Sequence, residues 1–172
     1  MKKRLLAVTA AAMAGTMMSL PVYALPTRRE LVESYLESDL EGPSYGEIFA
    51  QAGEKYGISP YLLQAISERE SMGIPDVKNG NCIGLMQVNG KIHKERMERL
   101  KVDDLTDPYG NIFVAADYLA ELYEKYEDTG LVLMLYSMKS ETAFNLYEKG
   151  VISNYAKGVS ERAAELEEKN GK

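Results

Sequence analysis

The chain has 172 residues, 45% of them hydrophobic, which is enough for one domain with a hydrophobic core. Its formal net charge of −6 argues against nucleic acid as the main partner, because contacts with phosphates need a basic surface. A single histidine and a single cysteine exclude a histidine-rich metal site and an internal disulfide bond, so we expect no metal and no cofactor.

Residues 1–24 have the pattern of a secretory signal peptide. Basic residues at positions 2–4 precede an apolar segment over 5–20, and Val22 and Ala24 provide the small residues of a cleavage site. The alternative is an uncleaved anchor, but the apolar segment is short for a membrane span. Cleavage removes three positive charges and changes the net charge from −6 to −9. We expect a secreted, acidic protein that keeps no stable membrane anchor.

Residues 25–43 are predicted to form an amphipathic helix followed by a linker. Thr27 and Glu30 have the spacing of a capping box, which starts a helix. The apolar residues that follow recur at helical spacing: Leu31, Val32, Tyr35, Leu36 and Leu40. This helix either packs on the domain that follows or serves as a docking segment for a partner.

From Ser44 onward the sequence predicts an all-α domain, with helices and no period-two strand series. Ser44 and Glu47 form a second capping box, and Asp107-Pro108 is a strong start signal for a later helix. Further helices are expected at 59–72, 91–100, 131–135, around 144–147 and from 153 onward. Residues 76–83 are turn-rich and are predicted to form a loop. The apolar run at 84–88 is either a minimal strand-like rung or the first turn of a helix.

Two glutamates lie near the end of the helix that begins after Ser59. At about 100° per residue, Glu70 shares a face with Leu63 and Ile66, whereas Glu68 points almost the opposite way, toward solvent. A carboxyl held against apolar groups has a raised pKa, as a general acid working near neutral pH requires. The alternative is that Glu70 is simply exposed at a frayed helix end.

A series of short motifs runs along the chain: Glu70-Ser71, Gly84-Leu85-Met86-Gln87, Asn111-Ile112, Tyr118-Leu119 and Tyr136. In order and spacing they resemble the transglycosylase domain of soluble lytic transglycosylases, relatives of goose-type lysozyme. The resemblance covers about residues 45–160. It implies a lysozyme-like fold and makes residues 44–172 the catalytic domain. The segment NGNCIGLMQV is most similar to small exported wall-degrading enzymes, some of them associated with conjugation systems.

The resemblance implies that Glu70 is both general acid and general base. It would protonate the bridging oxygen of the MurNAc–GlcNAc bond and then accept a proton from the 6-hydroxyl of muramic acid, which closes a 1,6-anhydro ring. Hydrolytic glycosidases usually need a second carboxylate. Asp76 is the nearest candidate and nothing singles it out. This absence favours transglycosylation over hydrolysis.

Six further residues are carried over from the family as candidates for substrate binding: Ser71, Gly84, Met86, Gln87, Tyr136 and Ser137. Ser71 would position substrate or cap the helix end, and Gln87 would contact the sugar. Gly84 would leave room for close approach of the backbone. Tyr136 would hydrogen-bond near Glu70 and hold it in place. For Met86, as for Asn111, packing or capping is the simpler interpretation.

The chain departs from the family at one motif. The family usually has Tyr-Asn-x-Gly where this chain has Tyr136-Ser137-Met138-Lys139. Ser137 is shorter than asparagine and offers fewer hydrogen bonds. Lys139 replaces a glycine that could require an unusual backbone angle. Substrate binding on this side of the site is therefore open to question.

Cys82 and His93 could in principle form the nucleophile–base pair of a peptidase. Cys82 is more simply a small buried apolar residue, and His93 is more simply a solvated residue on a charged helix.

Three functions are therefore considered. The favoured one is an exported, wall-associated peptidoglycan lytic transglycosylase whose partners are glycan strands and, in addition, a secretion or conjugation machinery. The second is a muramidase of the same fold, in which water attacks. The third is a catalytically impaired protein that binds peptidoglycan or assists assembly.

Overall fold

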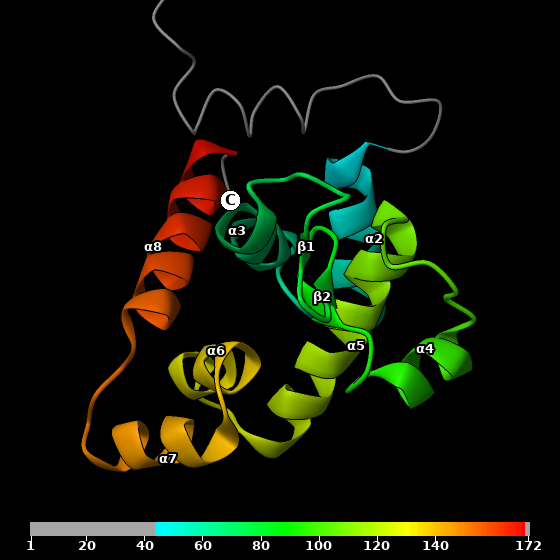
Figure 1. The fold of residues 1–172 in the computed structure, drawn as a ribbon. Coiled ribbons are helices and arrows are strands. Elements are labelled where there is room, and N and C mark those ends of the chain that lie inside the picture. Colours follow the sequence, from blue (N-terminus) through cyan, green and yellow to red (C-terminus); the bar gives the residue numbers. More distant parts are fainter. Residues whose placement is uncertain (1–43, 171–172) are drawn as a thin grey trace, which may run out of the picture.

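The computed structural model describes residues 44–170, which form seven helices and one small sheet (Figure 1). The helices are α2 (Tyr45–Tyr56), α3 (Pro60–Ser71), α4 (Lys94–Leu100), α5 (Pro108–Lys125), α6 (Thr129–Ser137), α7 (Ser140–Glu148) and α8 (Asn154–Lys169). The predicted all-α class with a minimal strand segment is confirmed. The predicted signal peptide at 1–24 and the predicted helix and linker at 25–43 lie outside the described residues.

Polar side chains start four of the helices. The Ser44 capping box is present, with the Ser44 backbone N–H donating to the Glu47 carboxylate over 2.7 Å. Asp107, Asp128 and Ser153 accept from backbone N–H groups at the starts of α5, α6 and α8. The helix starts at these positions follow from local chemistry.

The sheet consists of three two-residue antiparallel strands, β1 (Lys78–Asn79), β2 (Cys82–Ile83) and β3 (Val88–Asn89). The predicted loop at 76–83 therefore contains β1 and β2. Of the apolar run at 84–88, only Val88 is in a strand. Gly84 and Gln87 have positive φ angles of 82° and 47°, which an extended strand does not allow, so residues 84–87 form a turn.

Helix α5 is the centre of the core. Its residues Ile112, Val114, Ala116 and Leu119 are fully buried. It packs against α2, α6 and β3, while α3 packs against α2 and α8. Figure 1 shows α8 alongside α3, with the sheet between α3 and α5. This arrangement brings the end of α3, the sheet and the first turns of α8 to one side of the core.

Ion pairs, together with the half-buried side chains of Met97 and Leu100 that pack against the core, hold α4. This helix contains no buried residue. Its Arg96 pairs with Asp117 and Glu121 of α5, and Arg99 also pairs with Asp117. Within residues 44–170, no helix is long and apolar enough to cross a membrane.

Candidate active site

A cleft of about 480 Å³ opens beside the end of α3. Glu70 from α3 lines one part of it, and Gln87 and Val88 line another part from the sheet. Tyr118 from α5 lies farther along the wall, and residues 135–140 line it at the junction of α6 and α7. Four separate parts of the chain therefore contribute to one cavity, and the carboxyl of Glu70 belongs to it.

Glu70 lies in the last turn of α3 and is half-buried. Burial raises the pKa of its carboxyl, because the charged form loses hydration. Two weaker effects oppose this shift, a hydrogen bond from Tyr155 and the positive charge of Arg69. The predicted placement against apolar groups is therefore seen, and the carboxyl retains its proton to higher pH than an ordinary glutamate. A group of this kind can act as a general acid.

Tyr155, in the first turn of α8, is the residue that holds Glu70. Its hydroxyl donates to Oε1 of Glu70 over 2.5 Å. Burial and the nearby charge of Glu70 raise the pKa of this phenol well above its usual value, so it remains a neutral donor. The sequence indicated only that Tyr155 points inward. No local signal connects it with Glu70, because 85 residues separate the two.

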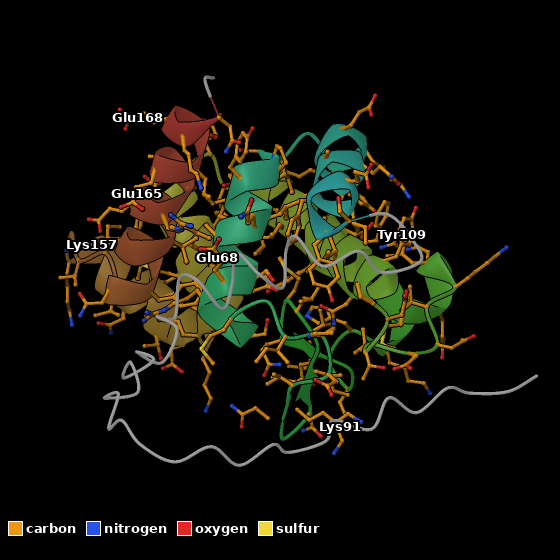
Figure 2. All side chains as sticks on the ribbon, turned by 90° about the horizontal axis from the view of Figure 1, so that it is seen from above. Glu68, Lys91, Tyr109, Lys157, Glu165 and Glu168 are labelled. Atoms are coloured by element: carbon orange, nitrogen blue, oxygen red, sulfur yellow. The ribbon has the colours of Figure 1, made fainter. Side chains whose placement is uncertain are left out.

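Glu68 corrects the prediction made from the helical wheel. Instead of facing solvent, its side chain is only 13% exposed and forms an ion pair with Arg162 of α8. Nε and Nη2 of Arg162 donate to the two carboxylate oxygens over 2.6 and 3.2 Å. Figure 2 shows Glu68 on the side of α3 that faces α8. The prediction was wrong because α8 covers this face, and helical periodicity contains no information about that contact.

Gln87 lies in the turn between β2 and β3 and lines the cleft. Its side-chain amide donates to the carbonyl oxygens of Val77 and Gly84 over 3.1 and 3.0 Å. The amide nitrogen therefore braces the turn. A contact between Gln87 and a sugar stays a prediction, which its place in the cleft wall allows.

Asn111, fully buried on α5, connects the turn to the core. Its Oδ1 accepts from the backbone N–H of Met86, and its Nδ2 donates to the carbonyls of Ile83 and Leu105, each over 2.8 Å. A Cβ atom at Gly84 would overlap the Asn111 side chain and the Leu105 carbonyl. The predicted close approach to the Gly84 backbone is therefore made by the Asn111 side chain. The role of Asn111 exceeds the packing or capping expected from the sequence.

Three of the predicted binding residues are buried and do not line the cleft: Ser71, Gly84 and Met86. Ser71 is 3% exposed, and its hydroxyl donates to the carbonyl of Ser67 within α3. Met86 is fully buried, and its carbonyl accepts from the hydroxyl of Tyr136 over 2.7 Å. For all three, direct contact with substrate stays a prediction.

Tyr136 lines the cleft, as does Ser137. The sequence predicted that Tyr136 holds Glu70, but its hydroxyl bonds to Met86, and Tyr155 takes the place at Glu70. Ser137 donates to the carbonyl of Met134 at the end of α6. Lys139 has φ −62° and ψ 136°, an ordinary extended conformation, so this position does not require glycine.

Cys82 and His93 both line the cleft, and neither matches its prediction fully. His93 is half-buried instead of solvated, with its ring 4.6 Å from that of Tyr118, and burial lowers its pKa. Cys82 is also half-buried, and burial raises the pKa of its thiol. A thiol that keeps its proton is a poor nucleophile, which disfavours the peptidase alternative.

In the described part of the chain, no group of three or more His, Cys, Asp or Glu side chains could hold a metal ion.

Residues 47–166 match the family model "Transglycosylase SLT domain". The chain therefore belongs to the lytic transglycosylase family that has this domain. Its half-buried acidic side chain lies beside a cleft in a small helical domain. The resemblance carried by Glu70-Ser71 and the later motifs is confirmed at the level of the family.

Three similarities accompany this match. The X polypeptide of Escherichia coli (strain K12) is 40% identical over 89 residues, 46% of this chain and 52% of that protein. The chain therefore aligns with about half the length of this relative. The membrane-bound lytic murein transglycosylase F of Maricaulis maris (strain MCS10) is 33% identical over 88 residues, 51% of this chain and 18% of that protein. An inactive mutant of the lytic transglycosylase Slt from Pseudomonas aeruginosa has a similar fold, with a TM-score of 0.62, 18% identity and coverage of 72% of this chain and 24% of that chain.

Proposed function

We propose that the protein is an exported peptidoglycan lytic transglycosylase that cleaves the β-1,4 bond between MurNAc and GlcNAc. The observation that supports this most directly is Glu70, a carboxyl of raised pKa in a cleft wall, held by a neutral phenol, in a chain of the SLT family. The relative from Maricaulis maris is by name a murein transglycosylase, which agrees with a peptidoglycan substrate.

In the first step, protonated Glu70 donates its proton to the bridging oxygen as the bond from this oxygen to C1 of MurNAc breaks. In the second step, the Glu70 carboxylate accepts the proton of the C6 hydroxyl, whose oxygen attacks C1 and closes the 1,6-anhydro ring. Glu70 ends with the proton it began with. The Tyr155 hydroxyl stabilises the carboxylate between the two steps and fixes its orientation.

The set of acidic groups favours transglycosylation over hydrolysis. Among the described residues that line the cleft, Glu70 is the one carboxylate. A hydrolase normally uses a second carboxylate to activate water or to stabilise the intermediate. An intramolecular hydroxyl group is already held beside C1, and its high effective concentration replaces this second group.

The ordinary backbone at Lys139 weakens the case for a catalytically impaired protein. The substitution of the family glycine introduces no strain, and Ser137 still lines the cleft. The site residues are proposed to act as follows: Glu70 as acid and base, with Gln87, Tyr136 and Ser137 toward the sugar. Residues 1–24 are proposed to direct export, and a secretion or conjugation machinery is proposed as a partner.

The test is mass spectrometry of the soluble products after mature protein meets purified peptidoglycan. We expect anhydro-muropeptides from the wild type and none from Glu70→Gln. Glu68→Gln, which changes a carboxylate two residues away and outside the cleft lining, is the matched control and should give the same products as the wild type. Reducing-end products would identify the muramidase instead. Binding to the wall without products from any variant would identify a binding protein.

A further inference from the structure

Lys139 is the one permanent cation among the described residues that line the cleft. The other ionisable side chains with a charge at neutral pH are Glu70 and His93. Burial raises the pKa of Glu70 and lowers that of His93, so both shifts favour the neutral forms. Among the described lining residues, the cationic side chain therefore lies at the junction of α6 and α7, in a chain whose net charge is −6.

The ammonium group of Lys139 is available to a ligand. Lys139 is exposed, and within residues 44–170 no ion pair or hydrogen bond of its ammonium is found. Other basic side chains near the core differ in this respect: Arg96 and Arg162 are each paired with carboxylates. The Lys139 ammonium is thus free to contact whatever enters the cleft.

The start of α7 adds partial positive charge beside Lys139, and the first turn of this helix also carries Glu141. Lys139 is the N-cap of α7, and its side chain makes no capping hydrogen bond. The first N–H groups of a helix carry partial positive charge and favour anions nearby. Ser140 is a neighbouring cleft-lining residue whose hydroxyl can donate a hydrogen bond, whereas the Ser137 hydroxyl already donates to the Met134 carbonyl. A cation and a hydroxyl donor therefore line the cleft together at the junction of α6 and α7.

We propose that Lys139 recognises a carboxylate carried by the glycan strand beside the cleaved bond, and so makes the protein selective for anionic over neutral glycans. This inference rests on the proposed function. In peptidoglycan such a carboxylate belongs either to the peptide stem or, where the stem has been removed, to the free lactyl group of muramic acid. A chitin-like oligomer of N-acetylglucosamine has neither.

Binding in the Glu70→Gln background separates recognition from cleavage. Calorimetry would compare Glu70→Gln with Glu70→Gln/Lys139→Gln on three ligands: peptide-bearing strands, strands freed of peptide, and an N-acetylglucosamine oligomer. We expect Lys139→Gln to weaken binding of a carboxylate-bearing strand about 3- to 10-fold, typical of one accessible charge-assisted contact. Binding of the neutral oligomer should not change. Whichever strand shows the larger loss identifies the stem or the lactyl group as the source of the carboxylate.

Three controls make the outcome decisive. Lys149→Gln, which removes an exposed cation at the other end of α7 and outside the cleft lining, should change no Kd. Lys139→Arg should restore binding, and added salt should reduce the difference between Lys139 and its glutamine variant. An equal loss on the neutral oligomer, or no loss on any ligand, would overturn the inference.

The same experiment distinguishes failure of this inference from failure of the proposed function. Unchanged Kd values in the Lys139 variant, with anhydro products from the wild type, would overturn the inference alone. The expected Kd pattern without any products from the wild type would overturn the proposed function alone. If no strand binds to Glu70→Gln, the inference is overturned, and if the wild type also gives no products, both are overturned.

Discussion

Glu68 and Glu70 lie two residues apart on α3, and both bond to α8, yet their partners differ in charge. Glu70 accepts from the neutral phenol of Tyr155, and Glu68 pairs with the guanidinium of Arg162. One carboxyl lines the cleft and the other does not. The comparison shows that two glutamates on one helix acquire different environments from the helix that covers them, a neutral donor for Glu70 and a guanidinium for Glu68.

Helix α8 supplies both partners from a single face. Tyr155 and Arg162 are seven residues apart, which is about two helical turns, so their side chains project in the same direction. Both face α3, the helix with which α8 makes its most extensive contact. A single packing interface therefore orients the acid at one end and fixes the two helices together farther along.

The largest expected effect is on activity. Glu70→Gln removes the proton donor and should lower the rate of anhydro-product formation by about 10²- to 10⁴-fold. Glu68→Gln should leave this rate within about threefold, because its side chain does not line the cleft. Both rates are measured by chromatography of the products. Similar losses for the two variants would contradict the distinction between the two glutamates.

The next effect is on stability. Arg162→Met leaves Glu68 largely buried without its guanidinium and should lower the free energy of unfolding by about 2–3 kcal/mol. The double variant Glu68→Met/Arg162→Met removes both charges and should recover most of this loss. Urea unfolding measures the wild type, the single variants Glu68→Met and Arg162→Met, and the double variant. Additive losses in the double variant would show that the two side chains do not interact.

A smaller effect on activity is expected at Tyr155. Tyr155→Phe removes a hydrogen bond that stabilises the Glu70 carboxylate, and should lower kcat about tenfold. The same bond lowers the Glu70 pKa, so its loss should raise that pKa further and move the alkaline limb of the pH–rate profile to higher pH. Tyr123→Phe, which removes a hydroxyl bonded to Thr129, is the control. An unchanged profile would mean that Tyr155 only packs.

The smallest effect links Glu70 to stability. The pKa of Glu70 is raised in the folded state. Its contribution to the free energy of unfolding is therefore fully present at pH below its unfolded pKa, and it is lost as pH rises through the folded pKa. Glu70→Gln cannot ionise, so its Tm should exceed that of the wild type near neutral pH, with a difference that shrinks on acidification. Glu68→Gln should have a lower Tm than the wild type at neutral pH. A difference for Glu70→Gln that grows in acid would contradict this sign.

The sequence was sufficient to predict those features of the fold and of the site that depend on interactions between residues close together in the chain. The capping boxes and start signals at Ser44 and Asp107 predict helix starts because the cap bonds to groups three residues away. The apolar stripe on α3 likewise predicts the environment of Glu70. The motif at Glu70-Ser71 and its companions predicts the family.

What the sequence could not predict depends on contacts between distant segments. Tyr155 bonds to a residue 85 positions away, and Arg162 to one 94 positions away. Periodicity on α3 contains no information about where α8 lies, so Glu68 was wrongly assigned to solvent. The turn at 84–87 was missed for a related reason, since Gln87 adopts a positive φ that its residue type does not suggest.

The three hydrogen bonds of Asn111 have a consequence for local unfolding. Two of them attach Met86 of the turn and Ile83 of β2 to the central helix, so the backbone N–H of Met86 can exchange with solvent only when the turn separates from α5. A surface turn of this length would ordinarily open many times before the domain unfolds. Here this wall of the cleft shares the protection of the core, so the surface is already formed before a ligand enters.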